Sequence, residues 1–330
     1  YWIGAVLIND AQDMQEKFTL FSDMVVFSSY AMQVVMSFMM LVMIFIMLPR
    51  ASVAAKRILE VLDTEPSIED GTRDTFPVMK DGEVEFKDVS FKYPDAEEYV
   101  LEHISFSAKK GETIAFIGAT GCGKSTAINL IPRFYDATEG EVFVDGVNVK
   151  EYTQEALHNK IGYVSQKAIL FSGTIADNVA YGENGKAPAT QDDIAMAVKV
   201  AQASEFVEKK DQGYDGYVAQ GGSNFSGGQK QRLSIARAIA RQPEILIFDD
   251  SFSALDYKTD RILREALRKE CKDATKIIVA QRIGTIRDAD KIIVLDDGQI
   301  AGMGTHDELM KNCEVYQEIA YSQLSKEELA

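Results

Sequence analysis

The sequence predicts an α/β domain with a helical insert, preceded by α-helical transmembrane sequence. Three features carry this prediction. Residues 24–48 form a run without a single charge. After residue 83, strand-like and helix-like segments alternate, as in a mainly parallel sheet wrapped by helices. Within that alternation, residues 118–126 form a glycine-rich loop between an apolar strand-like run and a helix-like run.

Composition narrows the class of protein. The chain has 330 residues and a net charge of −16, so we expect no nucleic-acid partner, because binding a phosphate backbone calls for clustered Lys and Arg. Three cysteines that lie far apart, Cys122, Cys271 and Cys313, predict neither a disulfide framework nor a zinc cluster and fit the reducing cytosol. The chain starts at Tyr1 in hydrophobic sequence without a signal-peptide layout, so we expect a fragment that lacks its front.

The first 62 residues are predicted to be the end of a transmembrane domain. Residues 1–9 are too short to span a bilayer and predict a partial span, whereas a helix over 24–48 would be roughly 37 Å long and could cross a hydrocarbon core of about 30 Å. Acidic residues precede this run, and Arg50, Lys56 and Arg57 follow it. The positive-inside rule therefore predicts that everything after Pro49 is cytoplasmic. The alternative is a buried helix of a soluble protein.

One face of the predicted span is polar. Ser29, Gln33 and Ser37 recur every four residues, and a stripe of methionines runs beside them. Polar groups in a membrane usually face the bundle interior, and methionine adapts to varied ligands, so this face is a candidate lining for a substrate path. Ordinary helix packing is the alternative.

Composition then marks the domain boundary. Residues 51–62 continue the helix as a cytoplasmic extension, and residues 63–82 are rich in Thr, Glu, Asp, Pro and Gly, which is typical of a linker. The α/β domain is expected over 83–330. Its expected strands are 84–91, 113–117, 141–144, 161–165, 245–248, 277–280 and 292–295, and its expected helices are 127–131, 191–202, 230–240 and 258–268. Thr305 to Glu308 reads as a capping box that opens a late helix, so His306 is expected in the cap turn and not as a ligand.

The glycine-rich loop fits the phosphate-loop (P-loop) pattern G-x-x-x-x-G-K-[ST] in the strand-to-helix context that this pattern requires. Glycines allow a tight turn that points N–H groups at phosphate oxygens. Lys124 is expected to reach the β- and γ-phosphates, and Ser125 to bind Mg²⁺. The loop predicts a P-loop NTPase that binds a nucleoside triphosphate through Gly118, Thr120, Gly121, Cys122, Gly123, Lys124, Ser125 and Thr126.

A second motif set narrows this class. Asn224 to Gln229 reads N-F-S-G-G-Q, and it precedes a helix-like run and then the apolar segment Ile245 to Asp249. The order and spacing resemble the ATP-binding-cassette (ABC) family over residues 83 to about 324. Fused behind a membrane helix, the chain is most similar to the exporter type, with 24–48 as the last transmembrane helix. The resemblance implies ATP and Mg²⁺ as cofactors and a transported small molecule.

The resemblance also implies roles for single residues. Tyr93 stands where an aromatic stacks on adenine, and Asp249 where a carboxylate holds Mg²⁺. Gln166 stands where a loop glutamine senses Mg²⁺ and contacts the membrane domain. Asp256 belongs to the loop that crosses the dimer interface. The signature Ser226, Gly227, Gly228 and Gln229 closes on ATP that is held by the opposite subunit. From the residues alone, Tyr93 could instead be a core aromatic and Gln166 a solvated loop residue.

Two catalytic positions depart from the family pattern. Asp250 stands where the family usually has Glu, and the loss of one methylene withdraws the carboxylate by roughly 1 Å, which can cost on the order of 10²-fold in rate. Gln281 stands where His is usual, and an amide can donate a hydrogen bond but cannot take up a proton. The site is therefore predicted to hold ATP and turn over slowly. This resembles the degenerate subunit of heterodimeric multidrug exporters, whose partner chain carries the Glu and the His. The alternatives are a homodimer in which Asp250 suffices, and a nucleotide-gated regulatory subunit that transports nothing.

Overall fold

A computed structural model describes residues 1–74 and 81–323, so linker residues 75–80 and domain residues 324–330 lie outside the described residues. The chain divides into two compact units, Tyr1–Ser67 and Ile68–Ala330. The division between the units falls inside the linker expected over 63–82.

The first unit consists of two helices, α1 (Trp2–Asp10) and α2 (Met14–Leu62). The 49 residues of α2 include Pro49 and the whole uncharged run, and the predicted extension 51–62 is part of the same helix. No residue of α2 is buried within the unit. By length and composition, α2 is the one helix among the described residues that could cross a membrane.

The second unit contains an antiparallel sheet with the strand order β2-β1-β4-β5. Its strands are β1 (Val84–Phe91), β2 (Leu101–Ala108), β4 (Glu139–Val144) and β5 (Val147–Asn148). The expectation that 84–91 and 141–144 join one mainly parallel sheet is wrong, because both pair in this separate sheet. Short links without a crossover helix, which favour antiparallel pairs, join β1 to β2 and β4 to β5. The β1–β4 pair joins strands that are separated along the chain by β2, β3 and α3.

The larger sheet has six strands in the order β12-β11-β3-β10-β9-β6. All pairs are parallel except β11 with β12. The strands are β3 (Thr113–Ile117), β6 (Ile161–Val164), β9 (Ile245–Asp249), β10 (Thr275–Val279), β11 (Lys291–Asp296) and β12 (Gln299–Gly304). The five parallel strands predicted from apolar runs are confirmed, with ends that differ by at most two residues.

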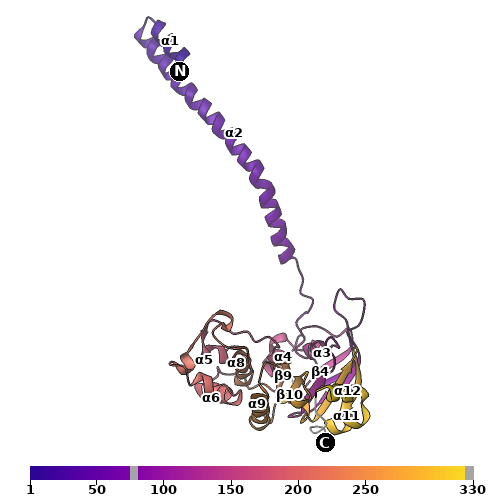
Figure 1. Cartoon of the computed structure of the whole chain (residues 1–330). Coiled ribbons are helices and arrows are strands. Elements are labelled where there is room, and N and C mark those ends of the chain that lie inside the picture. The colour runs from indigo at the N-terminus through magenta and orange to yellow at the C-terminus, as the bar shows by residue number, and fades with distance from the viewer. Residues whose placement is uncertain (75–80, 324–330) are drawn as a thin grey trace. The chain divides into compact units, whose positions relative to one another are not determined.

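Both faces of this sheet are covered, which explains why its strands are continuously apolar. Alternate side chains of β3 enter different cores: Ile114 and Phe116 pack with the antiparallel sheet, and Ala115 and Ile117 pack with the helical insert. The insert comprises α5 (Ile175–Val179), α6 (Gln191–Val200), α7 (Ser204–Val207), α8 (Gly227–Ala240) and the short strands β7 (Gly173–Thr174) and β8 (Tyr217–Val218). In Figure 1, α5, α6 and α8 group on one side of this unit, away from α11 and α12.

Six further α-helices lie in the described part of the unit. They are α3 (Lys124–Asn129), α4 (Gln154–Lys160), α9 (Tyr257–Glu270), α10 (Ile283–Ile286), α11 (His306–Asn312) and α12 (Glu314–Gln323). The helix expected at 127–131 begins three residues earlier, inside the P-loop motif. The capping box at Thr305 and Glu308 is confirmed, and His306 is the first residue of α11.

Candidate nucleotide site

The P-loop connects the end of β3 to the start of α3 through backbone that glycine favours. Gly118, Gly121 and Gly123 have φ values of 154°, 90° and 94°, all on the side of the map that L side chains rarely adopt. A Cβ on Gly118 would also collide with the carbonyl oxygen of Leu295 in β11. The first glycine therefore allows both the turn and the close approach of the loop to the neighbouring strand.

Lys124 and Ser125 occupy the first positions of α3. The ammonium of Lys124 donates to the carbonyl oxygens of Gly118 and Ala119 at 2.9 and 2.6 Å, so it lies over the concave side of the loop. The hydroxyl of Ser125 donates to Oδ1 of Asp249, at the end of β9, at 2.7 Å. A hydroxyl and a carboxylate side by side are oxygen ligands of the kind that Mg²⁺ prefers, so this pair fits the metal predicted from the sequence.

Tyr163 belongs to the same group of side chains, and sequence reasoning missed it. Its hydroxyl lies 2.9 Å from Oδ1 of Asn129 and 3.3 Å from Oδ2 of Asp249. Burial and the neighbouring Asp249 raise the pKa of Tyr163, so the phenol remains a protonated donor beside the carboxylate. The sequence offered one signal for this role, because Tyr163 lies in the strand-like run that leads into Gln166. In the structure this run is β6, which pairs with β9.

The three predicted catalytic positions converge. Nε2 of Gln166 lies 3.3 Å, and Nε2 of Gln281 3.0 Å, from the same carboxylate oxygen, Oδ2 of Asp250. Asp250 is only 8% exposed and has a φ of 46°. Burial raises the pKa of Asp250, and the hydrogen bond from Gln166 opposes that rise. The carboxylate is therefore restrained between two amides.

Tyr93 lies beside the far end of the P-loop. Its hydroxyl is 3.0 Å from Oγ1 of Thr126, and its ring meets Tyr135 edge-on at a centroid distance of 5.2 Å. Tyr135, which sequence reasoning did not single out, is partly exposed next to it. The two rings form an aromatic surface at the loop, where a planar base could pack.

The signature motif lies on a different element, the start of α8. Ser226 is the N-cap, and Ser226 and Gln229 form a reciprocal capping box. A Cβ on Gly228 would lie 3.1 Å from the carbonyl oxygen of Ala254, so this turn packs against the loop 253–256. Asp256 accepts from the backbone N–H of Thr259 and caps α9. Within the described parts of the chain, no hydrogen bond or ion pair joins the signature turn to the P-loop.

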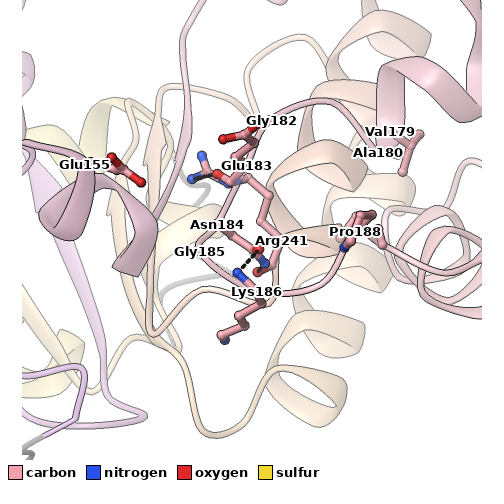
Figure 2. A pocket seen from close by; sticks show the side chains of 12 residues that line it. Glu155, Val179, Ala180, Gly182, Glu183, Asn184, Gly185, Lys186, Pro188 and Arg241 are labelled. Carbon is pink, nitrogen blue, oxygen red and sulfur yellow. Dashed lines mark hydrogen bonds between the residues drawn. The ribbon is translucent and has the colours of Figure 1, made fainter.

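A cavity of about 320 Å³ lies elsewhere, between α4, α5 and the end of α8. Figure 2 shows its lining loop, in which the backbone N–H of Lys186 donates to the side chain of Asn184. The amide nitrogen of Asn184 and the amine of Lys186 donate to backbone carbonyls, as does the guanidinium of Arg241. These donors hold the loop in place, so we assign the nucleotide site to the P-loop and not to this cavity.

The domain has a glycine loop between a strand and a helix, a lysine folded over that loop, and a serine paired with an aspartate at the end of β9, the second strand along from β3. Together these features define a P-loop nucleoside-triphosphate-binding domain. The serine and glycine turn that caps α8, on the insert, is an additional feature beyond this strand, loop and helix.

Comparison with known proteins identifies the type of domain. Residues 101–253 match the family model described as ABC transporter. The chain is 45% identical over 323 residues to an uncharacterized ABC transporter ATP-binding protein of Mycobacterium tuberculosis, covering 98% of this chain and 54% of the relative. It is 42% identical over 276 residues to an ATP-dependent lipid A-core flippase of Haemophilus influenzae, covering 84% of this chain and 46% of that protein.

A solved structure of a bacterial Atm1-family ABC exporter with ATP bound matches with a TM-score of 0.80 at 33% identity, covering 92% of this chain and 53% of that one. The chain therefore carries an ABC transporter ATP-binding domain, an ABC-type ATPase domain, and its homologues include ABC exporters. The predicted fold class, an ABC nucleotide-binding domain of P-loop type with an N-terminal helix, is confirmed. The chain spans about half the length of the curated relatives it matches.

Proposed function

We propose that the protein is one half of an ABC exporter, which couples ATP binding and hydrolysis to the efflux of drugs, lipids or peptides. The observation that carries the proposal is the Ser125–Asp249 pair beside the P-loop, in a chain that also contains a helix apolar enough to cross a membrane. Homologues that are exporters support the direction of transport. In this proposal the protein is a multi-pass protein of the cell membrane, residues 83–330 are cytoplasmic, and the partners are the bilayer and a small molecule rather than a nucleic acid.

We further propose that the chain's own ATP site binds nucleotide well and hydrolyses it slowly. Lys124, Ser125 and Asp249 would hold the triphosphate and Mg²⁺. Asp250 is a shorter carboxylate than Glu and is restrained by two amides. Gln281 offers a hydrogen-bond donor but no titratable ring. Water activation is thus the weakened step.

The signature turn supports a role toward a second chain. Ser226 and its two glycines stand at the start of a helix of 14 residues, where backbone N–H groups and the helix dipole favour an anion. In our proposal this turn completes the ATP site of a second ABC half-transporter, a different chain that carries the catalytic Glu and the switch His.

The test compares phosphate release by the purified full-length protein alone with release by the protein co-purified with its partner. We expect nucleotide binding in both preparations and much faster turnover in the second. Fast Mg²⁺-dependent turnover by the protein alone would favour a homodimer in which Asp250 suffices. ATP binding by the pair without substrate movement in vesicles would favour a nucleotide-gated regulatory subunit.

A further inference from the structure

The last described residue, Gln323, bridges two backbone groups where the loop after β10 enters α10. Its amide Nε2 donates to the carbonyl oxygen of Gln281 at 2.7 Å, and its Oε1 accepts from the backbone N–H of Ile283 at 2.9 Å. The side-chain amide of Gln323 thus acts once as donor and once as acceptor, and its two backbone partners are two residues apart along the chain.

That loop is also held from its other side. The side chain of Gln281 donates to Oδ2 of Asp250 at 3.0 Å. The next residue, Arg282, donates to the carbonyl oxygens of Leu255 and Ser253 at 3.2 and 3.1 Å. Residues 281–283 therefore connect the restrained carboxylate, the loop 253–256 and the end of α12.

Helix α12 is a firm support for this contact. Tyr316 and Ala320, four residues apart on one face, are fully buried, and the hydroxyl of Tyr316 lies 2.8 Å from Nδ1 of the buried His306. Gln323 itself is exposed at the end of the helix. Removing its amide would therefore release the loop without emptying a core position.

We infer that Gln323 is a positioning residue for the hydrolytic step: it fixes the backbone of residues 281–283 so that the amide of Gln281 stays on Asp250. The inference rests on the proposed ATPase function and adds to it a contact from the C-terminal helix. A displacement on the order of 1 Å at a reacting group can lower a rate by up to about 10²-fold. Since the remaining bonds of Arg282 still hold the loop, we expect a loss of about tenfold.

The test is steady-state ATP hydrolysis by the full-length, self-paired protein. Gln323→Ala should lower kcat about tenfold with unchanged KM for ATP, because the P-loop is not touched. The kcat of Gln323→Glu should lie between those of the wild type and Gln323→Ala, since a carboxylate still accepts from the N–H of Ile283 but cannot donate to the carbonyl oxygen of Gln281. The matched control is Gln317→Ala on the same helix, whose amide donates to the carbonyl oxygen of Met310; it should leave kcat unchanged.

A double-mutant cycle separates positioning from general destabilisation. In a Gln281→Ala background, Gln323→Ala should have no further effect on kcat; an equal tenfold loss there would overturn the inference. Wild-type kcat in the Gln323→Ala variant would overturn it as well, while leaving the proposed function intact. Absence of ATP hydrolysis by the wild type, alone and with a partner, would reject the proposed function and the inference together.

A second measurement does not depend on turnover. Hydrogen exchange of peptides covering residues 281–287 should accelerate in the Gln323→Ala variant and not in the Gln317→Ala variant. Unchanged exchange would show that the amide of Gln323 does not hold residues 281–283 in solution. It would overturn the inference even if the protein proves to be an active ATPase.

Discussion

Asp250 combines three constraints in one residue. Its backbone has a φ of 46°, its side chain is buried, and one carboxylate oxygen faces two glutamine amides. Aspartate is enriched in left-handed backbone because its short polar side chain can bond locally. The residue type predicted a carboxylate one methylene shorter than the Glu that is usual at this position. The tertiary structure adds that its direction is set by Gln166 and Gln281, which lie 84 and 31 residues away along the chain.

The first prediction restores the two family residues at these positions. Asp250→Glu combined with Gln281→His should raise phosphate release by the self-paired protein by up to about 10²-fold, because the longer carboxylate reaches the water and the imidazole can carry charge. The glutamate should also lower the free energy of unfolding by about 1 kcal/mol, since it tolerates the left-handed backbone less well.

The control for this prediction is the single variant Asp250→Asn, which keeps the side-chain length and removes the base. Its turnover should fall below that of the wild type. If the double variant shows no gain over the wild type, the limiting defect lies outside Asp250 and Gln281, for instance in the signature motif that a partner supplies.

At the scale of elements, the junction of β3, the P-loop and β11 depends on Gly118. A Cβ there would meet the carbonyl oxygen of Leu295 at a backbone φ of 154°. We expect Gly118→Ala to lower the free energy of unfolding by about 1–3 kcal/mol, the usual effect of overpacking, and to weaken ATP binding by displacing the loop. Denaturant unfolding and nucleotide titration would measure both effects.

Gly227 provides the matched glycine for that experiment. It is the first residue of α8, and a Cβ there would meet nothing within 4 Å. Gly227→Ala should therefore leave the denaturation midpoint close to that of the wild type. A Gly118→Ala protein as stable as Gly227→Ala would mean that the loop does not pack against β11 in solution.

The packing of α11 against α12 should depend on pH. Burial lowers the pKa of His306 below its ordinary value of 6.5, and Arg287 lowers it further, while Asp307 and Asp288 oppose the shift. Near pH 6 the unfolded chain then binds more protons at this site than the folded chain does. The free energy of unfolding therefore falls as pH drops below about 6.5.

His306→Gln should reduce this fall, as measured by thermal unfolding midpoints between pH 7.5 and pH 5. The control is His103→Gln. Its hydrogen bond to Asp88 raises the pKa of His103 at a solvent-exposed site, so its protonation adds stability at low pH. Removing the His103 imidazole should therefore not reduce the loss of stability at low pH. The prediction fails if His306→Gln and the wild type lose stability in parallel.

Elements were predicted best where apolar residues run continuously. The parallel strands β3, β9, β10 and β11 are buried on both faces, and each contains an uninterrupted run of three or more apolar residues. The strands β2 and β12 were missed: β2 alternates polar and apolar residues, and β12 contains two glycines that weaken its strand signal. The separate antiparallel sheet was missed because strand direction depends on pairing, which no local pattern encodes.

At the scale of the whole molecule, the signature turn and the P-loop belong to different elements and do not bond to one another within the described chain. We expect Ser226→Ala and Gly228→Ala to depress ATP hydrolysis at the partner's site while the chain's own ATP affinity stays unchanged. Ser226→Ala removes the N-cap of α8, at a cost of about 1 kcal/mol. The measurement is turnover of the co-purified pair together with nucleotide titration of this chain alone.

Ser223→Ala, three residues upstream and outside the S-G-G-Q turn, serves as the control and should leave the turnover of the pair unchanged. If the signature variants weaken nucleotide binding by this chain alone, the turn acts within its own subunit. That result would contradict the proposed exchange between chains.

The sequence alone determined the P-loop, the signature turn, the long apolar helix and the two departures at Asp250 and Gln281. Each of these depends on residue type within a short stretch, where local geometry decides the chemistry. Only the tertiary structure decided that Tyr163 joins Asp249, that one oxygen of Asp250 meets both glutamines, and that Gln323 holds residues 281–283. These contacts join residues far apart along the chain, and sheet pairing and helix packing bring them together, because no spacing in the sequence specifies which strand becomes the neighbour of which.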